Sequence, residues 1–109
     1  MARLAAHVWV GAYLARLRAA AIPAYVIAKG DQVSGTVLVK VATMDGQAVA
    51  LTRSFDLMTG ERTWVVLTEG AEADVDESIA KQGSFDRDLW VIEVEDPKGR
   101  HLLEEEGLS

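Results

Sequence analysis

Five carboxylates and one histidine near the end of the sequence have side chains that could do metal or acid–base chemistry. They are Asp86, Asp88, Glu93, Glu95, Asp96 and His101. Carboxylate oxygens bind Mg²⁺ or Ca²⁺, and a carboxylate pair can exchange protons with a substrate. The spacing argues against one site, because Asp86 and Asp88 precede a predicted strand while Asp96 follows it, and a strand rises about 3.3 Å per residue. We therefore interpret the cluster as a solvated sheet edge whose charges deter pairing with other strands.

The alternative function is a metal-dependent hydrolase or nucleotide-handling enzyme. The acidic segment 86–96 is the only observation that suggests it. Such an enzyme would use Asp86, Asp88 and Glu93 as metal ligands, His101 as the base, and Arg53 or Arg62 to hold an anionic substrate. The only two imidazoles, His7 and His101, lie near opposite ends of the chain. Neither has a second histidine or a cysteine at the spacing of a zinc site.

Two glycines, Gly30 and Gly35, have the spacing of a phosphate-binding loop. They are followed by Thr36 and Val37 instead of the lysine and hydroxyl residue of that motif, and a strand is predicted where a helix is needed. No serine lies in the G-x-S-x-G context of an activated nucleophile. We therefore predict no catalytic, cofactor-binding or metal-binding residue, and the sequence favours a function without an enzymatic step.

Residues 3–21 form a predicted helix that could cover a sheet. Its apolar stripe, about 140° wide on a helical wheel, has the width of a core-facing helix. The stripe consists of Ala6, Trp9, Val10, Tyr13, Leu14, Leu17, Ala20 and Ala21. Pro23 ends the helix because proline restricts the preceding residue and donates no amide hydrogen. Leu4 and Val8 lie off the stripe, so they offer a spare apolar surface for a homodimer.

After Pro23 the hydropathy changes to the two-residue period of strands. The predicted strands span residues 24–29, 36–42, 47–55, 62–68 and 89–94, and a second helix spans residues 69–82. Asp45-Gly46 is a hairpin signal, which predicts antiparallel pairing of the strands on either side of it. In the second helix, Asp74 and Glu77 resemble a capping box, and Gly83 fits the residue after the helix end.

The order α-β-β-β-β-α-β predicts an α+β fold with a mostly antiparallel sheet of about five strands. The strand at 89–94 is apolar on both faces at its start, which predicts a central position. Because each helix has one apolar stripe, we expect both helices to pack on one face of the sheet. Trp9, Trp64 and Trp90 are expected to anchor the core between helix and sheet.

The chain length of 109 residues suits one domain, which we expect to span residues 1–109. Its net charge of −6 has the wrong sign for binding nucleic acid through phosphates. Residues 1–40 carry a net +4 and residues 41–109 a net −10, so we expect the two parts to attract each other within the fold. The chain has no cysteine and no apolar run of about 18 residues. We therefore expect a cytoplasmic protein without a membrane span.

Several segments together resemble a known family. They are Val-Trp-Val-Gly-Ala-Tyr-Leu at residues 8–14, Lys-Gly-Asp at 29–31 with the strand at 35–41, and parts of residues 75–101, of which Phe-Asp-x-Asp-Leu-Trp-Val at 85–91 is the most distinctive. Over nearly its whole length the chain resembles the short alphaproteobacterial proteins of domain-of-unknown-function family 1491. The resemblance implies a bacterial cytoplasmic protein and supplies no catalytic residue.

These observations favour a small acidic module that works by binding. Its partner would be an unidentified protein or a second copy of the chain. The acidic part could also dock on a basic partner, which would increase the association rate more than the affinity.

Overall fold

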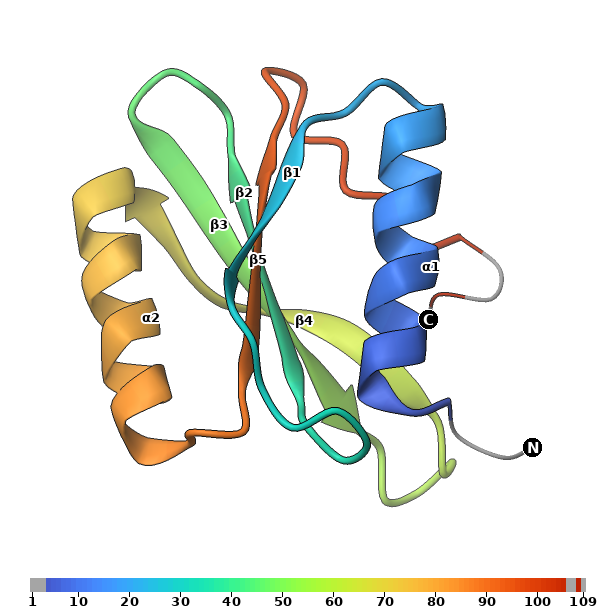
Figure 1. Ribbon diagram of the computed structural model, residues 1–109. Coiled ribbons are helices and arrows are strands. Elements are labelled where there is room, and N and C mark those ends of the chain that lie inside the picture. Colours follow the sequence, from blue (N-terminus) through green and yellow to red (C-terminus); the bar gives the residue numbers. More distant parts are fainter. Residues whose placement is uncertain (1–3, 106–107, 109) are drawn as a thin grey trace.

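The computed structural model of this chain describes residues 4–105 and Leu108, and it contains two helices and five strands (Figure 1). In chain order they are α1 (Ala6–Ala19), β1 (Ala24–Ala28), β2 (Val37–Ala42), β3 (Gln47–Phe55), β4 (Arg62–Ala71), α2 (Glu72–Phe85) and β5 (Trp90–Glu95). The predicted order and the α+β class are confirmed. Arg3, the first residue of the predicted first helix, lies outside the described residues.

The five strands form one mixed sheet in the order β1-β5-β2-β3-β4. The strands β2, β3 and β4 form an antiparallel meander that contains the predicted hairpin, and Gly46 takes a positive φ of 85° in the first of its turns. β5 also pairs antiparallel with β1 but parallel with β2, where Val39 lies opposite Ile92. The sheet is therefore mostly antiparallel. β5 lies inside the sheet, between β1 and β2, and not at an edge, which agrees with its apolar sequence.

The two helices lie on opposite faces of the sheet, so the expectation that both cover one face is wrong (Figure 1). In β2, Val37, Val39 and Val41 belong to the core on the α1 side, whereas Leu38 belongs to a smaller core on the α2 side. In β5, Val91 also belongs to the α2-side core. Because both central strands carry apolar side chains on each face, one helix is needed on each side to keep them from water.

The second helix begins and ends three residues later than predicted. Its N-cap is Ala71, which makes no side-chain cap, so the capping box of Asp74 and Glu77 is not formed. The Glu72 amide instead donates to the Gly46 carbonyl at 2.9 Å, so the turn after β2 supplies the acceptor. Gly83 lies inside the helix. Glu72 and Asp74 do occupy the first turn, where the helix dipole favours negative charge.

Two glycines on the α1 side of the molecule have opposite steric environments. A methyl group at Gly30 would overlap the backbone carbonyl of Asp88, whereas one at Gly11 of α1 would meet nothing within 4 Å. We expect Gly30→Ala to lower the free energy of unfolding by about 2 kcal/mol through overpacking. Gly11→Ala should raise it by up to about 1 kcal/mol, because alanine loses less backbone entropy in a helix. Urea unfolding of both variants measures whether the free energy of unfolding falls in the first and rises in the second.

Candidate functional site

The structure does not bring the acidic residues of segment 86–96 and His101 into one site. Glu93 lies on the α2 side of the sheet and binds Lys40. Asp86, at the end of α2, accepts from the Thr36 hydroxyl at 3.2 Å. On the α1 side, the His101 ring nitrogen Nδ1 accepts from the Leu103 amide at 3.1 Å. Within residues 4–105 and Leu108, no three His, Asp or Glu side chains are grouped so that they could hold a metal ion.

The remaining acidic candidates stabilise local structure. Asp96 is buried and accepts three hydrogen bonds from the backbone and guanidinium of Arg100, which lower the pKa of its carboxyl group. Glu95 accepts a hydrogen bond from the Tyr25 hydroxyl, which raises the pKa of that phenol. The Asp88 carbonyl accepts from the Asp31 amide at 3.0 Å. These residues thus connect β5 and its flanking turns to their neighbours.

Lys40 is the buried charge that the strand pattern did not predict. The residue is 4 % exposed, and its ammonium nitrogen lies 2.7 Å from Glu72, 2.6 Å from Asp76 and 3.0 Å from Glu93. Burial disfavours the charged form, but the three carboxylates outweigh it and raise the pKa of Lys40 above its ordinary value. The amine therefore stays protonated and is not a nucleophile. Lys40 connects α2 to the sheet, and it is one place where the basic and acidic parts of the chain attract each other.

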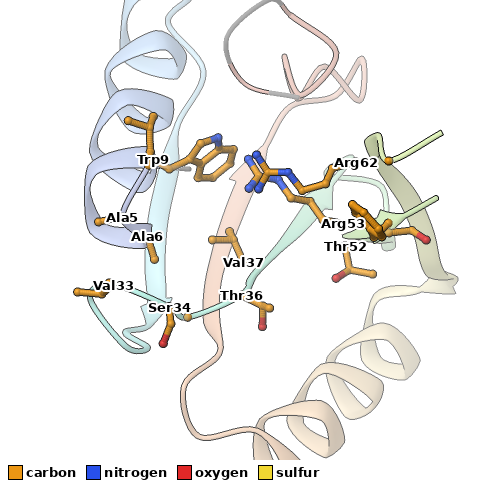
Figure 2. A pocket seen from close by; sticks show the side chains of 15 residues that line it. Ala5, Ala6, Trp9, Val33, Ser34, Thr36, Val37, Thr52, Arg53 and Arg62 are labelled. Atoms are coloured by element: carbon orange, nitrogen blue, oxygen red, sulfur yellow. The ribbon is translucent and has the colours of Figure 1, made fainter. Parts of the chain in front are cut away.

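A groove lies on the opposite side of the sheet, between α1 and the β3–β4 hairpin (Figure 2). Its volume is about 730 Å³. It is lined by Leu4, Ala5, Ala6, Trp9, Val33, Ser34, Gly35, Thr36, Val37, Thr52, Arg53, Ser54, Phe55, Gly60 and Arg62. The described lining thus contains two arginines, several hydroxyl groups and apolar side chains, but no carboxylate or imidazole. We call it the arginine groove.

One wall of the arginine groove is the loop between β1 and β2. The Asp31 carboxylate accepts from the Val33 and Ser34 amides at 3.0 and 2.8 Å and from the Ser34 hydroxyl at 3.0 Å. These hydrogen bonds, led by the one from the Ser34 amide, lower the pKa of Asp31. The Trp90 indole donates to the Asp31 carbonyl at 2.7 Å. The loop is therefore fixed both internally and against the start of β5.

The same loop holds the beginning of α1. The Ala6 amide donates to the Val33 carbonyl at 3.0 Å, and the His7 amide donates to the Gln32 carbonyl at 2.9 Å. His7 Nδ1 also lies 2.8 Å from the Gln32 carbonyl. These contacts satisfy amides that a helix N-terminus leaves without intrahelical partners. They also place Ala6 and Trp9 opposite the β3–β4 hairpin.

The other wall carries the two arginines. Arg53 lies opposite Trp64 in the β3–β4 pairing, and Arg62 lies opposite Phe55. Alternation along the strands places all four side chains on the α1 side, and Figure 2 shows Arg53 and Arg62 extending toward Trp9. The Arg53 guanidinium lies 4.8 Å from the Trp9 ring centre and 5.0 Å from that of Trp64. Cation–π contact with both rings fixes its position.

Next to the arginine groove, three N–H donors meet at one backbone carbonyl. The Leu108 oxygen accepts from the Trp9 indole at 3.2 Å, the Trp64 indole at 3.3 Å and Arg53 Nη2 at 3.2 Å. The Leu108 side chain is 1 % exposed and belongs to the α1-side core. We call these three donors and the cavity that Leu108 fills the leucine socket. Trp9 and Arg53 belong to both the socket and the groove.

The sequence indicated only part of this site. Arg53 and Arg62 were candidates for holding an anion, and the structure does bring them to one groove. The leucine socket was missed. A signal was present, because Arg53 alternates with Val49, Leu51 and Phe55 along a strand face that is otherwise apolar. An arginine at such a position needs partners near the core.

Comparison with known proteins agrees with this fold. A family model described as "Protein of unknown function (DUF1491)" matches residues 4–104. The chain belongs to the DUF1491 family. A crystal structure and an NMR structure of DUF1491 family proteins from Caulobacter crescentus CB15 are similar to it, with TM-scores of 0.86 and 0.83 and identities of 35 % and 34 %. These matches cover 94 % and 96 % of this chain and 97 % and 96 % of the other chains, respectively.

A solution structure from A. tumefaciens is also similar to this DUF1491 chain, with 25 % identity, a TM-score of 0.73 and 86 % coverage of each chain. The comparison with curated proteins returned no match. In this DUF1491 protein, the three donors of the leucine socket lie inside the matched residues, whereas Leu108 lies outside them. Among the described residues, no helix has the length and apolar character needed to cross a membrane.

Proposed function

We propose that residues 1–109 form one cytoplasmic, non-enzymatic domain that binds an acidic, partly apolar segment of a partner protein in the arginine groove. The observation that carries this proposal is the charge of the groove. Arg62 projects into it beside exposed apolar side chains, and its described lining contains no carboxylate, although the chain has a net charge of −6. Guanidinium groups are well suited to carboxylates because their donors can bind both oxygens at once.

Exposed apolar side chains around the arginine groove support a protein partner. Leu4, Val33 and Phe55 line it and are 58 %, 69 % and 57 % exposed. Two further exposed residues, Leu57 and Met58, lie in the loop of the same hairpin. Protein interfaces combine such apolar and aromatic side chains with arginine, and a few of these residues supply most of the affinity.

The chemistry of the groove favours binding over catalysis. Its described lining offers hydroxyl groups and arginines but no carboxylate or imidazole that could act as a general base. Lys40 lies on the other side of the sheet and is held as an ammonium ion. The residues of the alternative enzyme are therefore not combined with the arginines that would hold its substrate.

A second copy of the chain is the other candidate partner. Leu4 and Val8, the proposed homodimer surface, are 58 % and 45 % exposed. Leu4 also lines the arginine groove, so a dimer formed through this surface would cover part of its mouth. The identity of a crosslinked partner distinguishes the two cases.

Site-specific photocrosslinking in cells that express the protein natively tests this proposal. A photoreactive phenylalanine analogue replaces Phe55 in the groove, and the same analogue at Phe85, which is 82 % exposed at the end of α2, is the control. We expect a discrete crosslinked protein from position 55 and none from position 85. Arg62→Glu should reduce the yield at least tenfold, whereas Arg87→Glu, which changes the net charge equally, should not. Equal yields from both positions, or no effect of Arg62→Glu, would contradict the proposal. A captured second copy would identify self-association.

A further inference from the structure

The segment after β5 is bound to the rest of the fold mainly by side chains. Leu103 and Leu108 are both buried in the α1-side core, and the Arg16 guanidinium lies 3.5 Å from the Glu105 carboxylate. Within the described residues, the segment joins no strand of the sheet. Side chains of the rest of the fold instead hold its backbone at two carbonyls. The His101 carbonyl accepts from the Tyr13 hydroxyl at 2.7 Å, and the Leu108 carbonyl accepts from the indoles and guanidinium of the leucine socket.

This arrangement has the properties of peptide recognition. A pocket for one side chain sets the residue type, and fixed donors on the neighbouring carbonyl set the position of the backbone. The Arg53 guanidinium contacts the faces of the Trp9 and Trp64 rings, which also lie 5.5 Å from each other, and these contacts orient its donors. The sequence before Leu108 is acidic, since it contains Glu104 and Glu105. It therefore has the composition that the charge and apolar rim of the arginine groove favour.

We propose that the leucine socket is a binding site for an acidic, leucine-bearing peptide of a partner protein, and that Leu108 of the same chain occupies it as an intramolecular competitor. This inference rests on the proposed function, because Trp9 and Arg53 belong both to the socket and to the arginine groove. A partner segment that reaches from the groove into the socket must displace Leu108. A tethered competitor lowers the apparent affinity for the partner by the fraction of molecules in which the socket is occupied.

Full-length Leu108→Ser and a synthetic peptide with the sequence of residues 102–109 provide the test. Serine cannot fill the cavity, so the variant should bind the peptide at least tenfold more tightly than the unaltered chain does, as measured by calorimetry. A peptide in which serine replaces Leu108 should not bind. If Leu108→Ser does not fold, Leu108→Ala, which makes a smaller cavity, should give the same order of affinities with a smaller difference.

The indole N–H signals in a ¹⁵N correlation spectrum provide a second test. They should respond to the peptide only if the socket binds it, and not if Leu108 has a purely structural role. On peptide binding to the variant, the Trp9 and Trp64 indole signals should shift toward their positions in the unaltered chain. The Trp90 indole, which donates to Asp31, should stay in place. Equal peptide affinity for variant and unaltered chain, or no binding to either, would overturn the inference. A dimer of the unaltered chain with exchanged segments would overturn its assignment to a partner protein. Crosslinking from position 55 would remain valid in each case, so failure here is distinct from failure of the proposed function.

Discussion

Lys40→Met is expected to lower the free energy of unfolding by about 3 kcal/mol. The substitution leaves Glu72, Asp76 and Glu93 close together without the cation that they share. Removing one partner from a buried ion pair typically costs about 3 to 5 kcal/mol, and the partial exposure of the carboxylates places the loss near the lower limit. Urea unfolding at neutral pH measures it. Lys81→Met, at an exposed position of α2, is the matched control and should change stability by less than about 0.5 kcal/mol.

The pH dependence of the same variant provides a second test of the Lys40 ion pairs. The pKa of Lys40 is raised in the folded state, so its contribution is fully present below the ordinary value of 10.5 and is lost as the pH rises through the folded-state pKa. The stability difference between Lys40→Met and the unaltered chain should therefore shrink at strongly alkaline pH. A difference below about 1 kcal/mol at neutral pH would show that the ion pairs do not hold α2 to the sheet.

Trp9→Ala is expected to have the largest effect on stability, a loss of about 4 kcal/mol, because truncation of a buried tryptophan leaves a large cavity. The Trp9 ring is 4 % exposed, stacks 5.0 Å from the Tyr13 ring and lies 5.5 Å from that of Trp64. It also contacts Arg53 and donates to Leu108. The loss should appear in urea unfolding, with a changed near-ultraviolet circular dichroism spectrum of the folded state.

Two further variants separate packing from hydrogen bonding at this position. Trp9→Phe keeps an aromatic ring but removes the indole N–H, so it should cost less than Trp9→Ala and still weaken the hold on Leu108. Val8→Ala changes a neighbour in α1 that is 45 % exposed and should cost less than about 1 kcal/mol. If Trp9→Ala and Val8→Ala were equally stable, Trp9 would not anchor α1 to the sheet.

The helices, the strands and the β2–β3–β4 meander could be predicted because each depends on local patterns. The period change at Pro23, the Asp45-Gly46 turn and the apolar start of β5 are examples. The parallel pairing of β5 with β2 could not be predicted in this way. It joins strands about fifty residues apart, and no short turn determines it.

The layering was predicted wrongly because one apolar stripe on each helix does not determine which face of the sheet that helix covers. The sequence of β2 also hides its second buried face. Lys40 alternates with the valines of β2, and a lysine at such a position is typical of a solvent-facing strand. Its partners Glu72 and Asp76 lie on α2, and Glu93 lies on β5, so the burial of Lys40 becomes evident only once the tertiary structure places them together. The arginine groove also becomes evident only in the tertiary structure, because its walls come from α1, the β1–β2 loop and the β3–β4 hairpin.

An NMR titration with two short peptides tests the central claim, that the arginine groove binds acidic apolar segments. One blocked tetrapeptide has two glutamates flanked by leucines, and in the other lysines replace the glutamates. We expect the acidic peptide to shift the amide signals of groove residues such as Val33, Ser34 and Phe55. The basic peptide should shift none of them, and the signals of α2 should stay unchanged. Equal shifts with both peptides, or shifts confined to the α2 side of the sheet, would contradict it.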